Sequence, residues 1–184
     1  MTSYLDIMGS FLIGGLLLLT VFNLNADLMD RSYGGSLDLI AQEHAASIAE
    51  LIEYDFRKIG FGVDDSTAAI ISADSSRITF WSDIDADSAI DSVRYFLGDV
   101  SEASSTPNPL DRVLYRLVNG EPERDVNLGV TNFALTYFDA NRNATTTPSE
   151  IRTIQVDLTV ESTAPYDTRY SRASLRLRIR PKNL

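Results

Sequence analysis

The chain has 184 residues, no cysteine and one histidine, and its 26 acidic and 16 basic residues give a formal net charge of −10. This length suits one domain of ordinary size, and the absence of thiols excludes disulfides, zinc–thiolate sites and a cysteine nucleophile. A single histidine excludes a metal site built from several histidines, and the acid excess argues against a general nucleic-acid-binding protein, which carries a basic footprint.

The first predicted element is an apolar helix near the N-terminus. Residues Ile7–Leu24 read IMGSFLIGGLLLLTVFNL and contain no charge. At the rise of an α-helix this run covers roughly 27 Å, which is enough for the hydrocarbon core of a bilayer. A secretory signal peptide would have a basic n-region, which residues 1–6 lack. The segment is therefore predicted to be a retained membrane helix.

Two pairs of adjacent glycines lie in and just after this apolar run. Gly14 and Gly15 permit close approach of another helix, or are simply tolerated within the span. Gly34 and Gly35 are predicted to break the chain between two helical segments.

A second, amphipathic helix is predicted over residues 36–60. Ser36 suits its N-cap, and Gly60 can end it. His44 falls on or beside its apolar stripe and is predicted to be partly buried. The apolar positions recur at steps of three and four residues and are Leu37, Ile40, Ala41, Ala45, Ile48, Leu51, Ile52, Phe56 and Ile59.

The remaining chain reads as strands separated by turn-rich segments. The predicted strands are Ser76–Trp81, Ser92–Leu97, Arg112–Val118, Val130–Phe138, Ile151–Glu161 and Ser171–Arg180. The last two alternate between apolar and polar residues, which is typical of an antiparallel sheet with one buried face. The amphipathic helix is expected to cover that face, so the fold class is α+β, with an N-terminal helix segment (1–35) and a globular head (36–184) that comprises helix 36–60 and sheet 66–184.

Two acidic loops are candidate calcium sites, because hard oxygen ligands suit a hard cation. The loop 139–150 reads DANRNATTTPSE and has the spacing of a calcium loop, although an alanine replaces the usual glycine. Its candidate ligands are Asp139, Asn141, Asn143 and Glu150. The loop 83–91 offers Asp83, Asp85, Asp87 and Asp91. The alternatives are a hairpin loop stabilised by Asx turns and a solvated acidic turn, respectively.

The C-terminal segment 168–184 is basic and contains no acid. Its cations are Arg169, Arg172, Arg176, Arg178, Arg180 and Lys182. Pairing with acidic residues on a neighbouring strand of the same chain is favoured. An acidic face of another subunit is an alternative partner, and DNA is an unlikely one.

A long N-terminal helix, apolar first and amphipathic later, followed by an antiparallel sheet, resembles the type IV pilin and pseudopilin family. The resemblance is greatest to W-type minor pilins and to J-type pseudopilins of type II secretion. The stretches Leu51–Gly62, Ile78–Gly98 and Val130–Asn143 carry it. It implies a pilin-like fold in which Phe11, Leu12, Leu16 and Leu19 pack in the core of a filament.

The family has a basic leader that a peptidase removes, a methylated new N-terminus, and a glutamate at mature position five. This chain has no basic leader and no glutamate in the apolar run. If Met1 is removed, Asp6 becomes the fifth residue, so the resemblance assigns it the role of that acid in assembly. The alternative is that Asp6 lies among lipid headgroups. Either the leader is already absent from this numbering, or processing is atypical.

No catalytic motif is present in the sequence, and the chain is not expected to be an enzyme. The resemblance implies a structural subunit, major or minor, of an extracellular type IV filament (fimbrium) that acts in cell adhesion, or of a secretion pseudopilus. Its partners would be further copies or other pilin-like subunits. It would wait in the bacterial inner membrane before it joins an extracellular or periplasmic filament. The alternative is a membrane-anchored periplasmic or extracellular binding module that does not polymerise.

Overall fold

The computed structural model describes residues 2–64, 66–122 and 127–184. Met1 and residues 123–126, which fall within the segments predicted above, lie outside the described residues. The chain divides into two compact units, one reaching Leu37 and the other spanning Asp38–Leu184. The fold is α+β, with one long helix and an antiparallel sheet.

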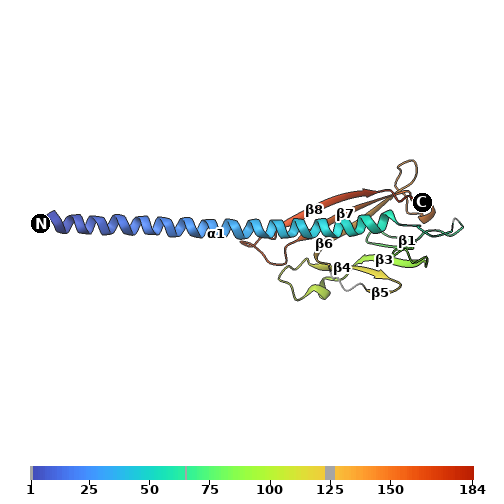
Figure 1. Ribbon diagram of the computed structural model, residues 1–184, viewed down its shortest axis with the longest axis horizontal. Helices are drawn as coiled ribbons and strands as arrows, with labels where there is room; N and C mark the ends of the chain where they lie inside the picture. The colour runs from blue at the N-terminus through green and yellow to red at the C-terminus, as the bar shows by residue number, and fades with distance from the viewer. Residues whose placement is uncertain (1, 65, 123–126) are drawn as a thin grey trace. The chain divides into compact units, whose positions relative to one another are not determined.

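The helix α1 (Thr2–Arg57) contributes to both units (Figure 1). It continues through Gly34 and Gly35, so the break predicted there is wrong. A glycine inside a helix costs only about 1 kcal/mol relative to alanine. The leucine-rich and alanine-rich turns on either side of the pair favour the helix strongly enough to offset that cost.

In the second unit, one face of α1 is buried against the sheet, which confirms the amphipathic helix. The buried side chains of this stripe are Ala41, Ala45, Ile48, Ala49, Ile52 and Phe56. Ile40 stays exposed, and His44 is exposed as well, so the prediction of a partly buried histidine is wrong. Both residues lie beside the stripe of buried side chains.

The sheet has the strand order β1-β2-β3-β4-β6-β7-β8, and β5 pairs with β4 at the side; every pairing is antiparallel. The strands are β1 (Ile70–Ala73), β2 (Arg77–Ser82), β3 (Asp91–Leu97), β4 (Arg112–Val118), β5 (Glu121–Pro122), β6 (Asn127–Phe138), β7 (Thr153–Glu161) and β8 (Arg172–Ile179). Six of them overlap the predicted strands. The short strands β1 and β5 were not predicted.

Two short 3₁₀ helices interrupt the connections, η1 (Val100–Ala103) and η2 (Pro148–Glu150). Asp99 caps η1, with Glu102 completing a reciprocal capping box. Pro148 begins η2, which delays the start of β7 to Thr153, two residues later than predicted.

The alternation predicted for β7 holds on its core face and fails at one end of its outer face. Ile154, Val156, Leu158 and Val160 are all buried, as predicted. Thr159 and Glu161 belong to the outer face, yet they are buried too. The loop that precedes β4 covers this end of β7, since Asn108 donates hydrogen bonds to Glu161 and to the carbonyl of Ser162.

Gly60 follows the helix at a position that only glycine fits. Its φ is +79°, its N–H donates to the carbonyl of Trp81 at 3.0 Å, and a Cβ there would lie 2.8 Å from the carbonyl oxygen of Asn183. Gly120 has a similar φ of +88° but open space around it. The left-handed conformation costs a non-glycine residue about 1–2 kcal/mol.

We therefore expect Gly60→Ala to lower the free energy of unfolding by more than Gly120→Ala. The Gly120 variant measures the cost of the left-handed backbone alone, because its added Cβ meets no other atom. Urea denaturation of the detergent-solubilised chain measures both, followed by the fluorescence of its one tryptophan, Trp81 in β2. If the two variants lose the same free energy of unfolding, the segment around Asn183 moves away from the added Cβ at no energetic cost.

Candidate functional site

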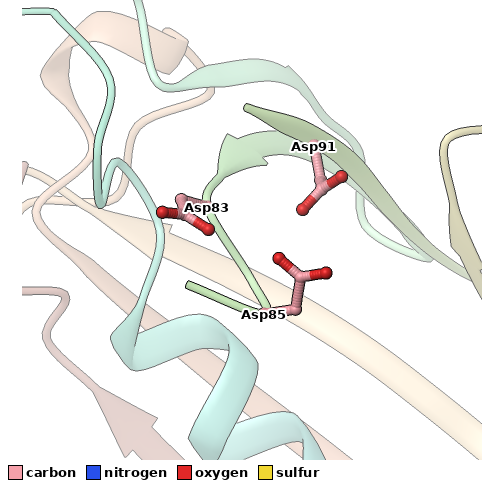
Figure 2. Close-up of side chains that lie close together, drawn as sticks. All are labelled: Asp83, Asp85 and Asp91. Atoms are coloured by element: carbon pink, nitrogen blue, oxygen red, sulfur yellow. The ribbon is translucent and has the colours of Figure 1, made fainter. Parts of the chain in front are cut away.

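Three carboxylates converge in the loop between β2 and β3. Asp83 follows the end of β2, Asp85 lies in the loop, and Asp91 begins β3. One oxygen from each lies within 4.8 Å of the other two, and Figure 2 shows Asp85 and Asp91 directed toward each other with Asp83 beside them. Asp83 and Asp91 are buried, whereas Asp85 is exposed.

The fourth predicted ligand, Asp87, is not part of this group. Its carboxylate instead accepts a hydrogen bond from the N–H of Ala89 at 2.7 Å. The structure thus brings together three of the four acids that the sequence singled out in this loop.

Backbone and side-chain donors already bind the two buried carboxylates. Asp83 accepts from the N–H groups of Asp87 and Ser88, both at 3.1 Å. Asp91 accepts from Asn119 Nδ2 at 2.7 Å and from the N–H of Ile84 at 3.3 Å. These donors offset part of the negative charge of the two carboxylates. Calcium at this loop remains a prediction.

The second predicted calcium loop is organised around Asp139. Its Oδ1 accepts from the N–H groups of Asn141 and Asn143, both at 2.8 Å, and these bonds lower the pKa of Asp139, with that from Asn143 contributing most. Glu150, at the far end of the loop, accepts from the Thr145 hydroxyl at 2.8 Å. The loop therefore has the Asx-turn geometry of the alternative interpretation, and calcium binding here also remains a prediction.

The first unit presents the apolar residues assigned to assembly. Most apolar side chains of this unit are exposed among the described residues, and Phe11, Leu12, Leu16 and Leu19 are 79%, 66%, 57% and 60% exposed. By length and composition, α1 could span a membrane.

The acid for which an assembly role is predicted is Asp6, near the start of α1. Leu5, which precedes it, is 71% exposed. Asp6 is exposed on the first turns of α1, and its carbonyl accepts from the hydroxyl of Ser10. The assembly role of Asp6 remains a prediction.

The basic strand β8 pairs with β7 of the same chain, as the sequence favoured. Arg176 Nε lies 2.5 Å from Asp157 Oδ1, and Arg172 Nε lies 3.4 Å from Glu161 Oε1. The hydrogen bond from Arg176 lowers the pKa of Asp157. Intramolecular pairing of Arg172 and Arg176 is therefore confirmed.

Sequence reasoning missed a buried ion pair that joins α1 to the sheet. Asp55 of α1 is completely buried, and its Oδ2 accepts from Arg116 Nε of β4 and from the hydroxyl of Tyr95 of β3, each at 2.5 Å. Burial, followed by the charge of Asp55, raises the pKa of Tyr95 well above its ordinary value, so this hydroxyl stays a donor.

A signal for this pair was present in the sequence. Asp55 lies three residues after Ile52 and four before Ile59, on the apolar stripe of the helix. Arg116 lies two residues after the buried Leu114, on the same face of its strand. A charged residue at a core position in each of two elements indicates that they pair, because a buried charge needs a partner.

Comparison with protein-family models, curated proteins and solved structures gives no match for this chain.

Proposed function

We propose that this chain is a structural subunit of a type IV filament or of a secretion pseudopilus, and that it polymerises through the apolar part of α1. The observation that carries the proposal is the exposed apolar surface of the first unit, where leucine and phenylalanine side chains have no partner within the described chain. Such a surface is stable only in lipid or against other apolar helices.

Lipid can cover this apolar surface first, and neighbouring subunits can cover it later. The span Ile7–Leu24 is long enough for a bilayer core. Transfer of such a helix from lipid to a helical filament core exchanges one apolar environment for another, so its hydrophobic cost is small. Packing of Phe11, Leu12, Leu16 and Leu19 against the same segment of other subunits then supplies the van der Waals contacts that hold the filament.

The head domain is firmly attached to the second half of α1. The second half of α1 forms part of the head's hydrophobic core, and the Asp55–Arg116 pair fixes it to β4. A pull on the Asp38–Arg57 part of α1 would therefore act directly on the sheet of the head. The role is structural and not catalytic.

Asp6 would guide assembly in this proposal. An acid at the edge of an apolar helix is costly in lipid unless it finds a partner. A positively charged N-terminal amine of a neighbouring subunit is such a partner, and pairing with it would set the axial offset between adjacent helices.

Disulfide cross-linking tests the proposal, because the chain has no cysteine of its own. Leu16→Cys is expected to give disulfide-linked dimers in material sheared from the surface of cells that make the protein, since position 16 faces other copies in the filament core. The matched control Ser149→Cys, at an exposed position of the head, is expected to give none. An added Asp6→Asn change is expected to reduce the sheared material.

Recovery of the protein only in membranes, with no sheared material and no filaments by electron microscopy, would contradict polymerisation. That result would favour the alternative function, a membrane-anchored binding module.

A further inference from the structure

In the strand order of the described chain, β8 comes last and has one neighbour, β7 (Figure 1). The two strands pair continuously from Arg172 to Ile179 of β8. Among the described residues, no backbone N–H or carbonyl of β8 forms a hydrogen bond to a segment other than β7. The free edge of β8 therefore offers a row of backbone donors and acceptors on which a further strand can form.

The apolar layer on the core face of the sheet is incomplete at this edge. Phe133 of β6, Leu158 of β7 and Leu175 of β8 are cross-strand neighbours in one row. Phe133 and Leu158 are 2% and 1% exposed, whereas Leu175 is 37% exposed. Leu177, which lies on the same face of β8, is only partly buried. An apolar side chain from an added strand would cover Leu175 and extend the row.

The edge of β8 lacks the features that usually prevent strand addition. Edge strands are commonly protected by a proline, by a bulge or by a charge directed toward the core. This strand contains no proline, its pairing with β7 has no bulge, and every residue on its core face is apolar. Its outer face carries arginines, which repel a basic strand and attract an acidic one. A second copy of β8 is therefore a poor partner, because pairing would bring the arginines of both strands together on one face.

The positive charges of β8 are balanced at its beginning and not at its end. Arg172 and Arg176 pair with two acids of β7, at 3.4 and 2.5 Å. Arg178 instead contacts a neutral amide, Gln155 Oε1, at 3.3 Å, and Arg180 is exposed directly after the strand. Neither Arg178 nor Arg180 forms a salt bridge among the described residues. Acidic side chains of a partner would balance these two charges.

We propose that the free edge of β8 binds an extended segment of a partner protein, in which apolar and acidic residues alternate, as an added strand of the sheet. Its apolar side chains cover Leu175, and its acidic side chains meet Arg178 and Arg180. In this mode of recognition, main-chain hydrogen bonds supply affinity and alternate side chains supply specificity. The whole surface belongs to the second unit, so the inference goes beyond polymerisation through the apolar part of α1.

Peptide binding to the detergent-solubilised chain tests the proposal. The probe is a fluorescein-labelled peptide, as long as β8, of alternating valine and glutamate, and its control has lysine in place of glutamate. The wild type is expected to bind the glutamate peptide at least roughly tenfold more tightly, because two cross-strand charge pairs change from attraction to repulsion. Fluorescence anisotropy measures both affinities. Backbone amides of β8 are expected to exchange with solvent more slowly when the glutamate peptide is bound.

Three variants separate the contributions of charge and of apolar contact. Arg178→Glu/Arg180→Glu is expected to reverse the preference, so that the lysine peptide binds more tightly. Arg142→Glu is the matched control, since it changes an exposed arginine of the loop 139–150 and is expected to leave the preference unchanged. Leu175→Lys is expected to weaken binding of the glutamate peptide although it adds a positive charge, because it removes the apolar contact.

Equal affinities of the wild type for the two peptides, or no binding of either, would overturn the proposal. So would tighter binding of the glutamate peptide by Leu175→Lys, which would indicate charge attraction without strand addition. Disulfide-linked dimers of Leu175→Cys in the absence of peptide would also overturn it, because they would assign the edge to a second copy of this chain.

Discussion

Arg116→Ala is expected to lower the free energy of unfolding by about 3–5 kcal/mol, because removal of one partner leaves the completely buried Asp55 carboxylate without its counter-charge. Arg116 joins β4 to α1, so the loss falls on the contact between helix and sheet on which the head depends. Urea denaturation of the detergent-solubilised chain, followed by Trp81 fluorescence, measures the effect.

The exposed pair Glu53–Arg57 on the same helix provides the control. Its atoms also approach to 2.5 Å, but the two side chains are 40% and 60% exposed. Solvent screens such a pair, so Arg57→Ala is expected to cost no more than about 0.5 kcal/mol. The double variant Asp55→Leu/Arg116→Met is expected to recover part of the stability, because it removes both charges and keeps the space filled, but it leaves the buried Tyr95 hydroxyl without its acceptor. Equal losses in Arg116→Ala and Arg57→Ala would contradict the importance of burial.

Phe56→Ala is expected to be as damaging, with a loss of about 3–5 kcal/mol in the free energy of unfolding. Phe56 is completely buried, and its ring meets Phe80 and Tyr95 edge to face at centroid distances of 5.8 and 5.5 Å. Truncation would open a cavity where α1, β2 and β3 meet. The same denaturation experiment measures it.

Tyr54→Ala is the matched control for this cavity. Tyr54 lies two residues earlier on the helix and is 56% exposed, and its ring interacts with Lys58 Nζ at 4.5 Å. We expect its loss to stay within about 1 kcal/mol, the strength of an exposed cation–π contact. A comparable loss in both variants would show that the helix does not use the Phe56 face for packing.

Local patterns in the sequence predicted most of the elements, because periodicity is a property of neighbouring residues. The stripe that includes Ala45, Ile48 and Ile52 predicted the face of α1 that packs on the sheet, and Ile154, Val156 and Leu158 predicted the core face of β7. The break predicted at Gly34 and Gly35 was wrong, because the prediction used the low helix propensity of glycine and left out the helix-forming residues on either side.

The candidate sites were predicted less completely. Loop composition brought out Asp83, Asp85 and Asp91, which do lie together, but it did not reveal that Asp87 bonds to the backbone instead. The residue type is the same in either setting, so spacing alone does not tell a converging side chain from one that caps its own turn.

The sequence by itself determined the apolar N-terminal helix, the amphipathic stripe and the alternating strands, since each follows from the order of adjacent residues. Only the tertiary structure decided that Asp55 meets Arg116 across 61 positions of the chain, and that the loop before β4 buries Glu161 of β7 through Asn108. The physical reason is that the energy of a charge depends on what covers it. That covering comes from segments distant in the chain, whose approach no local pattern records.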